Sequence, residues 1–177
     1  MAGRGSARKA HLRRSRATEF SPAGARGNAL LKTIRYYADS SFLVSCYVVD
    51  SNTTQAKIYL TRTGPPLAFT ALHALEVRNA FKLGIFRELL TVTDANAAWT
   101  NLKKDLHSGR LVRATVKWSS AFRLAARLSE QHSATCGTRS LDILHVATAK
   151  AMRVEEFVSF DARQRTQAAA IGLRVAP

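Results

Sequence analysis

Two aspartates stand where a predicted strand ends and a helix begins. Asp39 closes the short β-favouring run 34–39, and Asp161 follows the run 156–160. In open α/β sheets, ligands bind at the carboxyl edge of the strands, in the crevice where the strand order reverses. An N-cap role for the following helix would also explain either aspartate, although Ser40 and Ser41 could cap the first helix instead.

Two further acids lie on apolar helical patterns. Glu76 has leucine or alanine at i−4, i+4 and i+7, and Asp142 is the only acid within the apolar segment 141–151. Burial of an unpaired carboxylate is costly, so each acid needs a partner or a function. His73 at i−3 could pair with Glu76, and Arg139 or His145 could pair with Asp142.

If these acids converge, about four negative charges face one cleft, and like charges so close cannot all ionise without a partner. Carboxylate oxygens suit the hard cations Mg²⁺ and Mn²⁺, which would resolve the conflict. His73 and His145 suggest a mixed histidine and carboxylate site, but a packed or hydrogen-bonded histidine is the simpler interpretation.

Charge and composition narrow the class of protein. The 177 residues carry 27 Lys and Arg against 12 Asp and Glu, a net charge of +15, and 46% are hydrophobic. That is enough for one core, and no apolar stretch of about 18 residues could cross a membrane. Cys46 and Cys136 are far apart without a CxxC motif, which disfavours zinc and disulfides and fits a reducing, cytoplasmic setting. Both thiols are expected in the core. A basic protein with an acidic pocket suggests a phosphate-containing polyanion as substrate.

The N-terminal segment differs from the rest of the chain. The first 35 residues contain nine basic residues and one acidic residue, more than half of the net charge. With few large apolar residues, 1–32 is predicted to be a disordered basic arm. It could bind nucleic acid, serve as a targeting segment, or result from a misassigned start near Leu30 or Leu31. The folded domain is expected over 33–177.

Strands and helices alternate along that domain. The patterns predict strands at 34–39, 67–70, 156–160 and 173–175, and helices at 42–49, 53–62, 71–83, 94–107, 119–132, 138–153 and 162–170. Segment 110–117 is ambiguous. Parallel strands need crossover connections, so this alternation predicts an α/β fold with a parallel sheet covered on both faces.

Four motifs in this order resemble the PIN-domain ribonucleases, and within them the VapC-like toxins of bacterial toxin–antitoxin pairs. They are Asp39-Ser40-Ser41 after the first strand, ALEVRNAF around Glu76, TRSLDILHVATA around Asp142, and FVSFDARQ around Asp161. The resemblance covers about 34–175. It implies a three-layer α/β/α PIN-like domain with a short-stranded parallel sheet.

The resemblance also implies an activity and its residues. It implies a Mg²⁺- or Mn²⁺-dependent endoribonuclease that hydrolyses RNA phosphodiester bonds. By the same resemblance, the catalytic acids are expected to be Asp39, Glu76, Asp142 and Asp161, all four holding the metal, Glu76 directly or through water, and Ser41 and Ser159 are expected to support the site.

The expected partners are an RNA substrate, a cognate antitoxin that blocks the cleft, and a second copy in a homodimer, with no membrane. A non-catalytic RNA-binding PIN-like module is the alternative. A phosphatase with Asp39 as nucleophile fits less well, because Ser41 stands where that class would place a second acid.

Removal of residues 1–31 is expected to leave the melting temperature and Mg²⁺-dependent RNA cleavage unchanged. Because seven basic residues are lost, non-specific RNA binding should weaken and its salt dependence should flatten. Thermal melting and RNA-binding titrations at several salt concentrations test this. An insoluble or unfolded truncated protein would mean instead that the segment packs on the domain.

Overall fold

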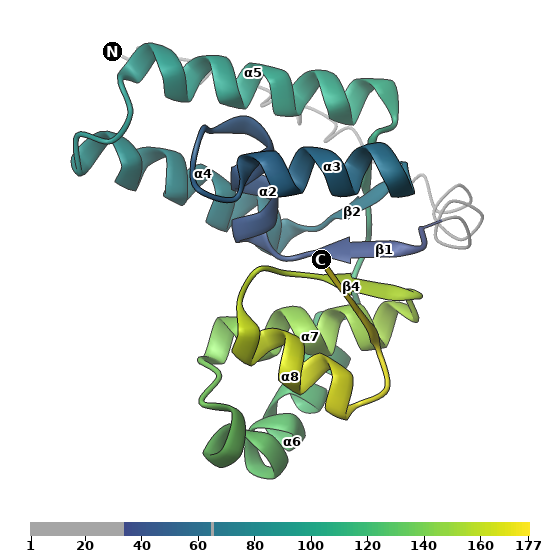
Figure 1. Ribbon diagram of the computed structural model, residues 1–177. Coiled ribbons are helices and arrows are strands. Elements are labelled where there is room, and N and C mark those ends of the chain that lie inside the picture. The colour runs from purple at the N-terminus through teal and green to yellow at the C-terminus, as the bar shows by residue number, and fades with distance from the viewer. Residues whose placement is uncertain (1–33, 65) are drawn as a thin grey trace, which may run out of the picture.

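The sheet of this protein is short-stranded and parallel. The computed structural model describes residues 34–64 and 66–177, so the predicted arm over 1–32 lies outside the described part. The strands are β1 (Tyr36–Ala38), β2 (Leu67–Phe69), β3 (Leu111–Arg113), β4 (Glu156–Val158) and β5 (Arg174–Ala176). They are ordered β3-β2-β1-β4-β5, and every neighbouring pair is parallel (Figure 1).

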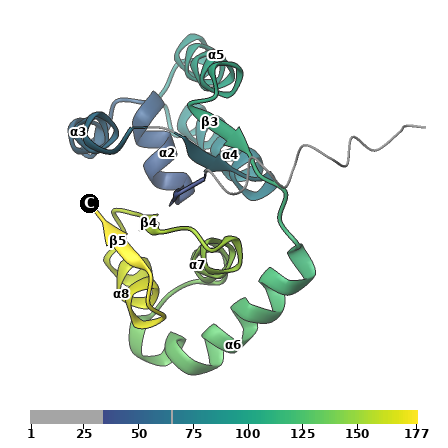
Figure 2. The same cartoon turned by 90° about the vertical axis from the view of Figure 1, so that its right-hand side faces the viewer.

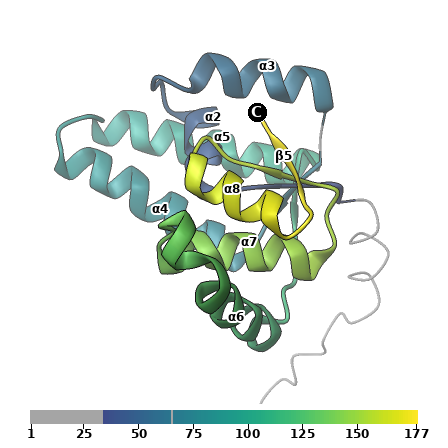
Figure 3. The same cartoon turned by 60° about the horizontal axis from the view of Figure 1, so that its bottom comes forward.

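Helices cover both faces of this sheet. They are α2 (Ser40–Tyr47), α3 (Thr53–Thr63), α4 (Ala71–Phe86), α5 (Val92–Ser108), α6 (Trp118–Cys136), α7 (Ser140–Met152) and α8 (Ala162–Ala170). Figure 2 shows α2, α3, α4 and α5 on one side of the strands and α6, α7 and α8 on the other. Figure 3 brings the second layer forward, in which α7 packs against both α6 and α8. This is the predicted three-layer α/β/α arrangement.

Alternation along the strands divides the core in two. Tyr36 and Ala38 of β1 pack into the cluster with α2 and α5, whereas Tyr37 between them packs into the cluster with α6 and α7. Successive strand side chains point to opposite faces, so three residues suffice to contribute to both cores. Phe157 and Val158 of β4 divide in the same way.

The sheet order places a switch point beside the first strand. From β1 the chain proceeds to β2 and β3 in one direction, and β4 and β5 then continue from the other side of β1. The crevice outside such a reversal is the usual ligand site of an open α/β sheet. Asp39 follows β1 and Asp161 follows shortly after β4, so both lie at the carboxyl edge beside this switch point.

Several details differ from the sequence-based expectations. Asp39, and not Ser40 or Ser41, caps α2, because its carboxylate reaches the Phe42 amide. The ambiguous segment 110–117 contains the edge strand β3. Both cysteines are partly exposed rather than fully in the core.

The helix predicted at 71–83 runs past Gly84 and forms α4. A Cβ on Gly84 would lie 2.7 Å from Cδ1 of Leu90. Glycine therefore allows Leu90 to fold back against the helix, and α4 continues to Phe86. Among the residues described, no helix combines the length and apolar character that a bilayer crossing needs.

Tyr37 and Phe157 stack in the core that the sheet forms with α6 and α7, and this pair offers a test of stability. Phe157 is fully buried and stacks on Tyr37, with 6.1 Å between the ring centroids. Phe157→Ala should lower the free energy of unfolding by about 3–5 kcal/mol through lost burial and the resulting cavity. Phe122→Ala makes the same change at a side chain that is 59% exposed and should cost less than about 1 kcal/mol. Urea unfolding measures both, and equal losses would contradict this division of the core.

Candidate active site at the carboxyl edge of the sheet

Asp39 is the buried carboxylate at the centre of the edge. It is 1% exposed. Its Oδ1 accepts the Phe42 amide at 2.8 Å, and its Oδ2 accepts the hydroxyls of Ser41 at 2.9 Å and Ser159 at 3.0 Å. Burial raises the pKa of Asp39, and these three donors oppose the rise without cancelling it. Asp39 therefore has both a capping role and a chemical environment unlike that of a surface acid.

Glu76 faces the same edge from α4, beside Asp39 and its neighbours. Its Oε2 lies 2.5 Å from Nε2 of His145 and accepts the Ser40 hydroxyl at 2.7 Å. Burial would raise the pKa of Glu76, but the contacts with His145 and Ser40 outweigh it and the pKa is lowered. The Glu76 side chain is 22% exposed and that of His145 is 3% exposed, so His145 supports the carboxylate from inside the protein.

The histidine behind Glu76 is itself held in place. Nδ1 of His145 lies 2.8 Å from the Tyr37 hydroxyl, and burial raises the pKa of that phenol, so Tyr37 is neutral. His145 also stacks on His73, with ring centroids 5.2 Å apart. His145 is thus a hydrogen-bonded core residue, as the sequence suggested. Glu76 pairs with it rather than with His73, which the sequence had offered as a partner.

His73 has a fixed tautomer. Its Nδ1 accepts the Thr70 amide at 3.0 Å, so Nε2 carries the proton and donates to the Ala38 carbonyl at 2.8 Å. This bond ties the first turn of α4 to the last residue of β1. Burial, together with the nearby His145, lowers the pKa of His73 well below its ordinary range.

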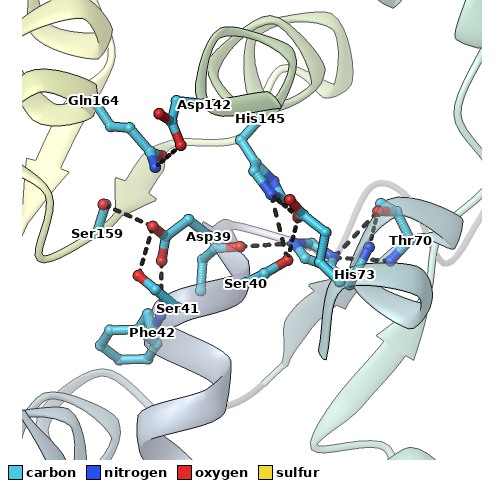
Figure 4. Close-up of polar contacts among 12 residues, drawn as sticks. Asp39, Ser40, Ser41, Phe42, Thr70, His73, Asp142, His145, Ser159 and Gln164 are labelled. Carbon is cyan, nitrogen blue, oxygen red and sulfur yellow. Dashed lines mark hydrogen bonds and ion pairs between the residues drawn. The ribbon is translucent and has the colours of Figure 1, made fainter. Parts of the chain in front are cut away.

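Asp142 lies near the start of α7 and is 7% exposed. Its Oδ2 accepts Nε of Arg139 at 2.9 Å and the Arg139 amide at 3.2 Å, while its Oδ1 accepts Nε2 of Gln164 at 2.9 Å. The ion pair with Arg139, one of the alternatives considered from the sequence, is therefore present. Gln164 comes from α8, so Asp142 also connects α7 with α8 (Figure 4).

Asp161 is the N-cap of α8. Its Oδ1 accepts the amides of Arg163 and Gln164, and its Oδ2 lies 3.1 Å from a terminal guanidinium nitrogen of Arg163. Burial would raise the pKa of Asp161, but the bonds from Arg163 and the backbone prevail and lower it. The Ser159 hydroxyl accepts the Asp161 amide and donates to Asp39, which links the two strand ends.

The structure thus connects the predicted site residues through short contacts. Ser159 joins Asp39 to the Asp161 backbone, and Ser40, the residue after Asp39, binds Glu76. Asp142 completes the edge from α7. However, no group of three or more His, Cys, Asp or Glu within 34–64 and 66–177 is placed to hold a metal ion. In this arrangement each carboxylate binds donors of the protein itself.

The donor set nevertheless fits a hard cation in its chemistry. All four side chains offer carboxylate oxygens. Gln164 Oε1 and Thr138 Oγ1, next to the Asp142 and Arg139 pair, are buried acceptors without a hydrogen-bond partner among the described residues. Such atoms are normally satisfied by water or a ligand. The edge therefore has the ligand types for Mg²⁺ or Mn²⁺, provided that Asp142 and Asp161 exchange their arginine partners for the ion.

The sequence patterns did not identify Gln164 as a contact of Asp142. They predicted Arg139 as a possible ion-pair partner of Asp142, but not that its backbone amide also donates to this carboxylate. The available signal was spacing, because Gln164 is three residues after the capping Asp161 and so falls on the inner side of the first helical turn.

The fold is similar to that of two solved structures. The crystal structure of FitAcB from Neisseria gonorrhoeae matches 80% of this chain and 96% of that chain, with a TM-score of 0.53 and 16% identity. The crystal structure of PAE2754 from Pyrobaculum aerophilum matches 81% of this chain and 83% of that chain, with a TM-score of 0.51 and 19% identity. The PIN-like fold is therefore confirmed. No family model matches the sequence, and no curated protein is significantly similar to it.

The buried His73 predicts a pH dependence of stability. Its pKa is lowered in the folded state. Below the ordinary histidine pKa of about 6.5, His73 therefore becomes protonated in the unfolded chain while it stays neutral in the folded protein. Stability should therefore fall as the pH drops below about 6.5, by at most about 1.4 kcal/mol per pH unit from this group.

His73→Gln keeps a donor and an acceptor but removes this titration, so the stability gap between wild type and variant should shrink as the pH falls. Urea unfolding in EDTA between about pH 5 and pH 7 measures the gap. A gap that stays constant over this range would contradict the assignment.

Proposed function

We propose that this protein is a metal-dependent endoribonuclease and the toxin of a toxin–antitoxin pair. The observation that carries the proposal is the set of carboxylates at the carboxyl edge of a PIN-like sheet, on both sides of its switch point. Asp39 and Asp161 come from neighbouring strand ends, and Glu76 and Asp142 come from helices that begin at the same edge. Their order in the chain also matches the motifs that resemble the PIN-domain ribonucleases.

Asp39, Asp142 and Asp161 would hold a Mg²⁺ or Mn²⁺ ion, with Glu76 as a further ligand, directly or through water. When bound, the ion would polarise the scissile phosphate and lower the pKa of a water molecule. Ser41 and Ser159 donate to Asp39 Oδ2 and so orient that carboxylate. Because these hydrogen bonds already orient the carboxylate, little conformational entropy is lost when a ligand binds to it.

Glu76 would act on the attacking water. It is the acid that His145 and Ser40 hold toward the edge while its side chain stays partly open to solvent. From there it would accept a proton from the attacking water or orient that water. A general base must lie within hydrogen-bond reach of its proton, and an acid at the rim of a cleft satisfies this when the substrate enters.

An RNA substrate fits the charge of the chain. The net charge of +15 attracts a polyanion and favours strongly salt-dependent binding. A cognate antitoxin would inhibit by placing a basic side chain among the carboxylates, where Arg139 and Arg163 already show that guanidinium groups fit. A homodimer and a cytoplasmic setting complete the proposal.

One observation favours the second candidate, a non-catalytic RNA-binding module. Within the described ranges the carboxylates are already paired with internal donors, and no group of three potential ligands surrounds an ion-sized space. Such a protein would bind RNA and leave it intact when Mg²⁺ or Mn²⁺ is added.

Asp142→Asn tests the proposal directly. Asparagine is nearly isosteric but brings no charge to an ion, so Mn²⁺-dependent cleavage of a labelled single-stranded RNA should fall by about a hundredfold or more. Mn²⁺ should raise the melting temperature of the wild type by mass action, and this shift should be smaller in the variant.

Glu130→Gln is the matched control, because it removes one negative charge from an exposed position on α6. It should behave like the wild type in both measurements. Wild-type cleavage rates in Asp142→Asn would rule out the catalytic assignment, and intact RNA with the wild-type protein in Mn²⁺ would favour the binding module.

A further inference from the structure

Two arginines of this chain lie directly on the acidic edge. Arg139 donates from Nε to Asp142 at 2.9 Å, and Arg163 donates to Asp161 from NH2 at 3.1 Å and from Nε at 3.4 Å. Both acids belong to the proposed metal site, so each arginine holds a ligand that a metal ion would need. Both guanidinium groups are open to solvent, which weakens their contribution to folding stability, so their position at the edge calls for another reason.

The two arginines come from the starts of different helices but lie near the same turn, the one before α7. Arg139 is the residue before α7, and Arg163 lies in the first turn of α8. Cδ of Arg163 is 3.8 Å from the point that a Cβ on Gly137 would occupy, so this side chain extends from α8 toward the turn that leads into α7. The bond with Asp161 raises the pKa of Arg163, while the charge of Arg139 is close enough to oppose the rise.

Both guanidinium groups keep unused donors that point to solvent. The side chain of Arg139 is 73% exposed and that of Arg163 is 49% exposed. Among the residues that the structure describes, the terminal nitrogens NH1 and NH2 of Arg139 and NH1 of Arg163 make no hydrogen bond. A planar fork of free N–H groups is the geometry that binds phosphate oxygens in pairs.

A second feature of this corner is a pair of buried side-chain oxygens. Gln164 is 4% exposed, and its Nε2 binds Asp142, yet its Oε1 has no hydrogen-bond partner in the described part of the chain. Thr138, next to Arg139, has a buried hydroxyl in the same condition. Buried oxygens beside a carboxylate are suited to a cation or its bound water.

We infer that Arg139 and Arg163 exchange partners: they neutralise Asp142 and Asp161 in the free protein and bind phosphates of the RNA backbone once a divalent cation takes over the carboxylates. This inference rests on the proposed function and deepens it, because it adds two positioning residues and a coupling between metal and substrate. The metal and the guanidinium groups compete for the same carboxylate oxygens. A guanidinium displaced by the ion stays at the edge, where the phosphate of an incoming RNA is its natural new partner.

The inference predicts effects of opposite sign from one substitution. Arg139→Gln removes the competitor for Asp142, so Mn²⁺ should bind several-fold more tightly, seen as a thermal shift that is half complete at a lower Mn²⁺ concentration. The same variant should bind a nuclease-resistant single-stranded RNA analogue several-fold more weakly at saturating Mn²⁺, with a salt slope reduced by about one. Arg163→Gln should show the same pair of changes through Asp161.

Arg62→Gln is the control. Arg62 is an equally exposed arginine near the end of α3, shortly before β2 begins, and therefore at the opposite edge of the sheet. It loses the same charge but should leave Mn²⁺ binding unchanged and weaken RNA binding less. If Arg139→Gln does not fold, Arg139→Lys replaces it, because lysine keeps the charge but lacks the planar fork of N–H donors. Like Arg139→Gln, it should bind Mn²⁺ more tightly and RNA more weakly.

The outcomes separate this inference from the proposed function. If Arg139→Gln and Arg163→Gln leave both affinities as in Arg62→Gln, or change the Mn²⁺ and RNA affinities in the same direction, the partner exchange is overturned even if the wild type cleaves RNA. Opposite changes would support it even if the wild type cleaves no RNA, in which case only the catalytic proposal fails.

Discussion

The buried carboxylate of Asp39 is the interaction on which the rest of the edge depends. It ends the central strand, begins the first helix, and receives donors from α2 and from the segment after β4. A carboxylate so deeply buried is tolerated only because three hydrogen bonds replace its water. Those donors bring Ser159, and through it the Asp161 backbone, to within reach of the switch point.

The three other acids near Asp39 are each paired with a basic side chain of the protein itself. Glu76 has His145, Asp142 has Arg139 and Asp161 has Arg163, so each negative group at the edge has an internal partner. The partners differ in kind. His145 is sealed in the core and fixes its carboxylate, whereas the arginines are exposed and can leave theirs. This difference separates the rigid side of the site from the side that a ligand can rearrange.

Sequence patterns predicted the parallel α/β/α fold and the edge position of the acids, because strand and helix periodicities and turn residues are local properties. Local rules also suggested the pair between Arg139 and Asp142, which are three residues apart. They could not suggest the pair between Glu76 and His145, which are 69 residues apart and meet only in the folded protein. They also misplaced the end of α4, because the return of Leu90 over Gly84 depends on the conformation of the following turn.

The strand order has a consequence for the synthesis of this protein. The hydroxyl of Ser159 and the carboxylate of Asp39 are 120 residues apart in sequence, and β1 lies directly between β2 and β4. While the chain emerges from the ribosome, the β1–α5 half can collapse, but its central strand has an unpaired edge until β4 is complete. The acidic edge is therefore assembled only when the last quarter of the polypeptide has been translated. A partially made chain therefore lacks the complete set of carboxylates at this edge.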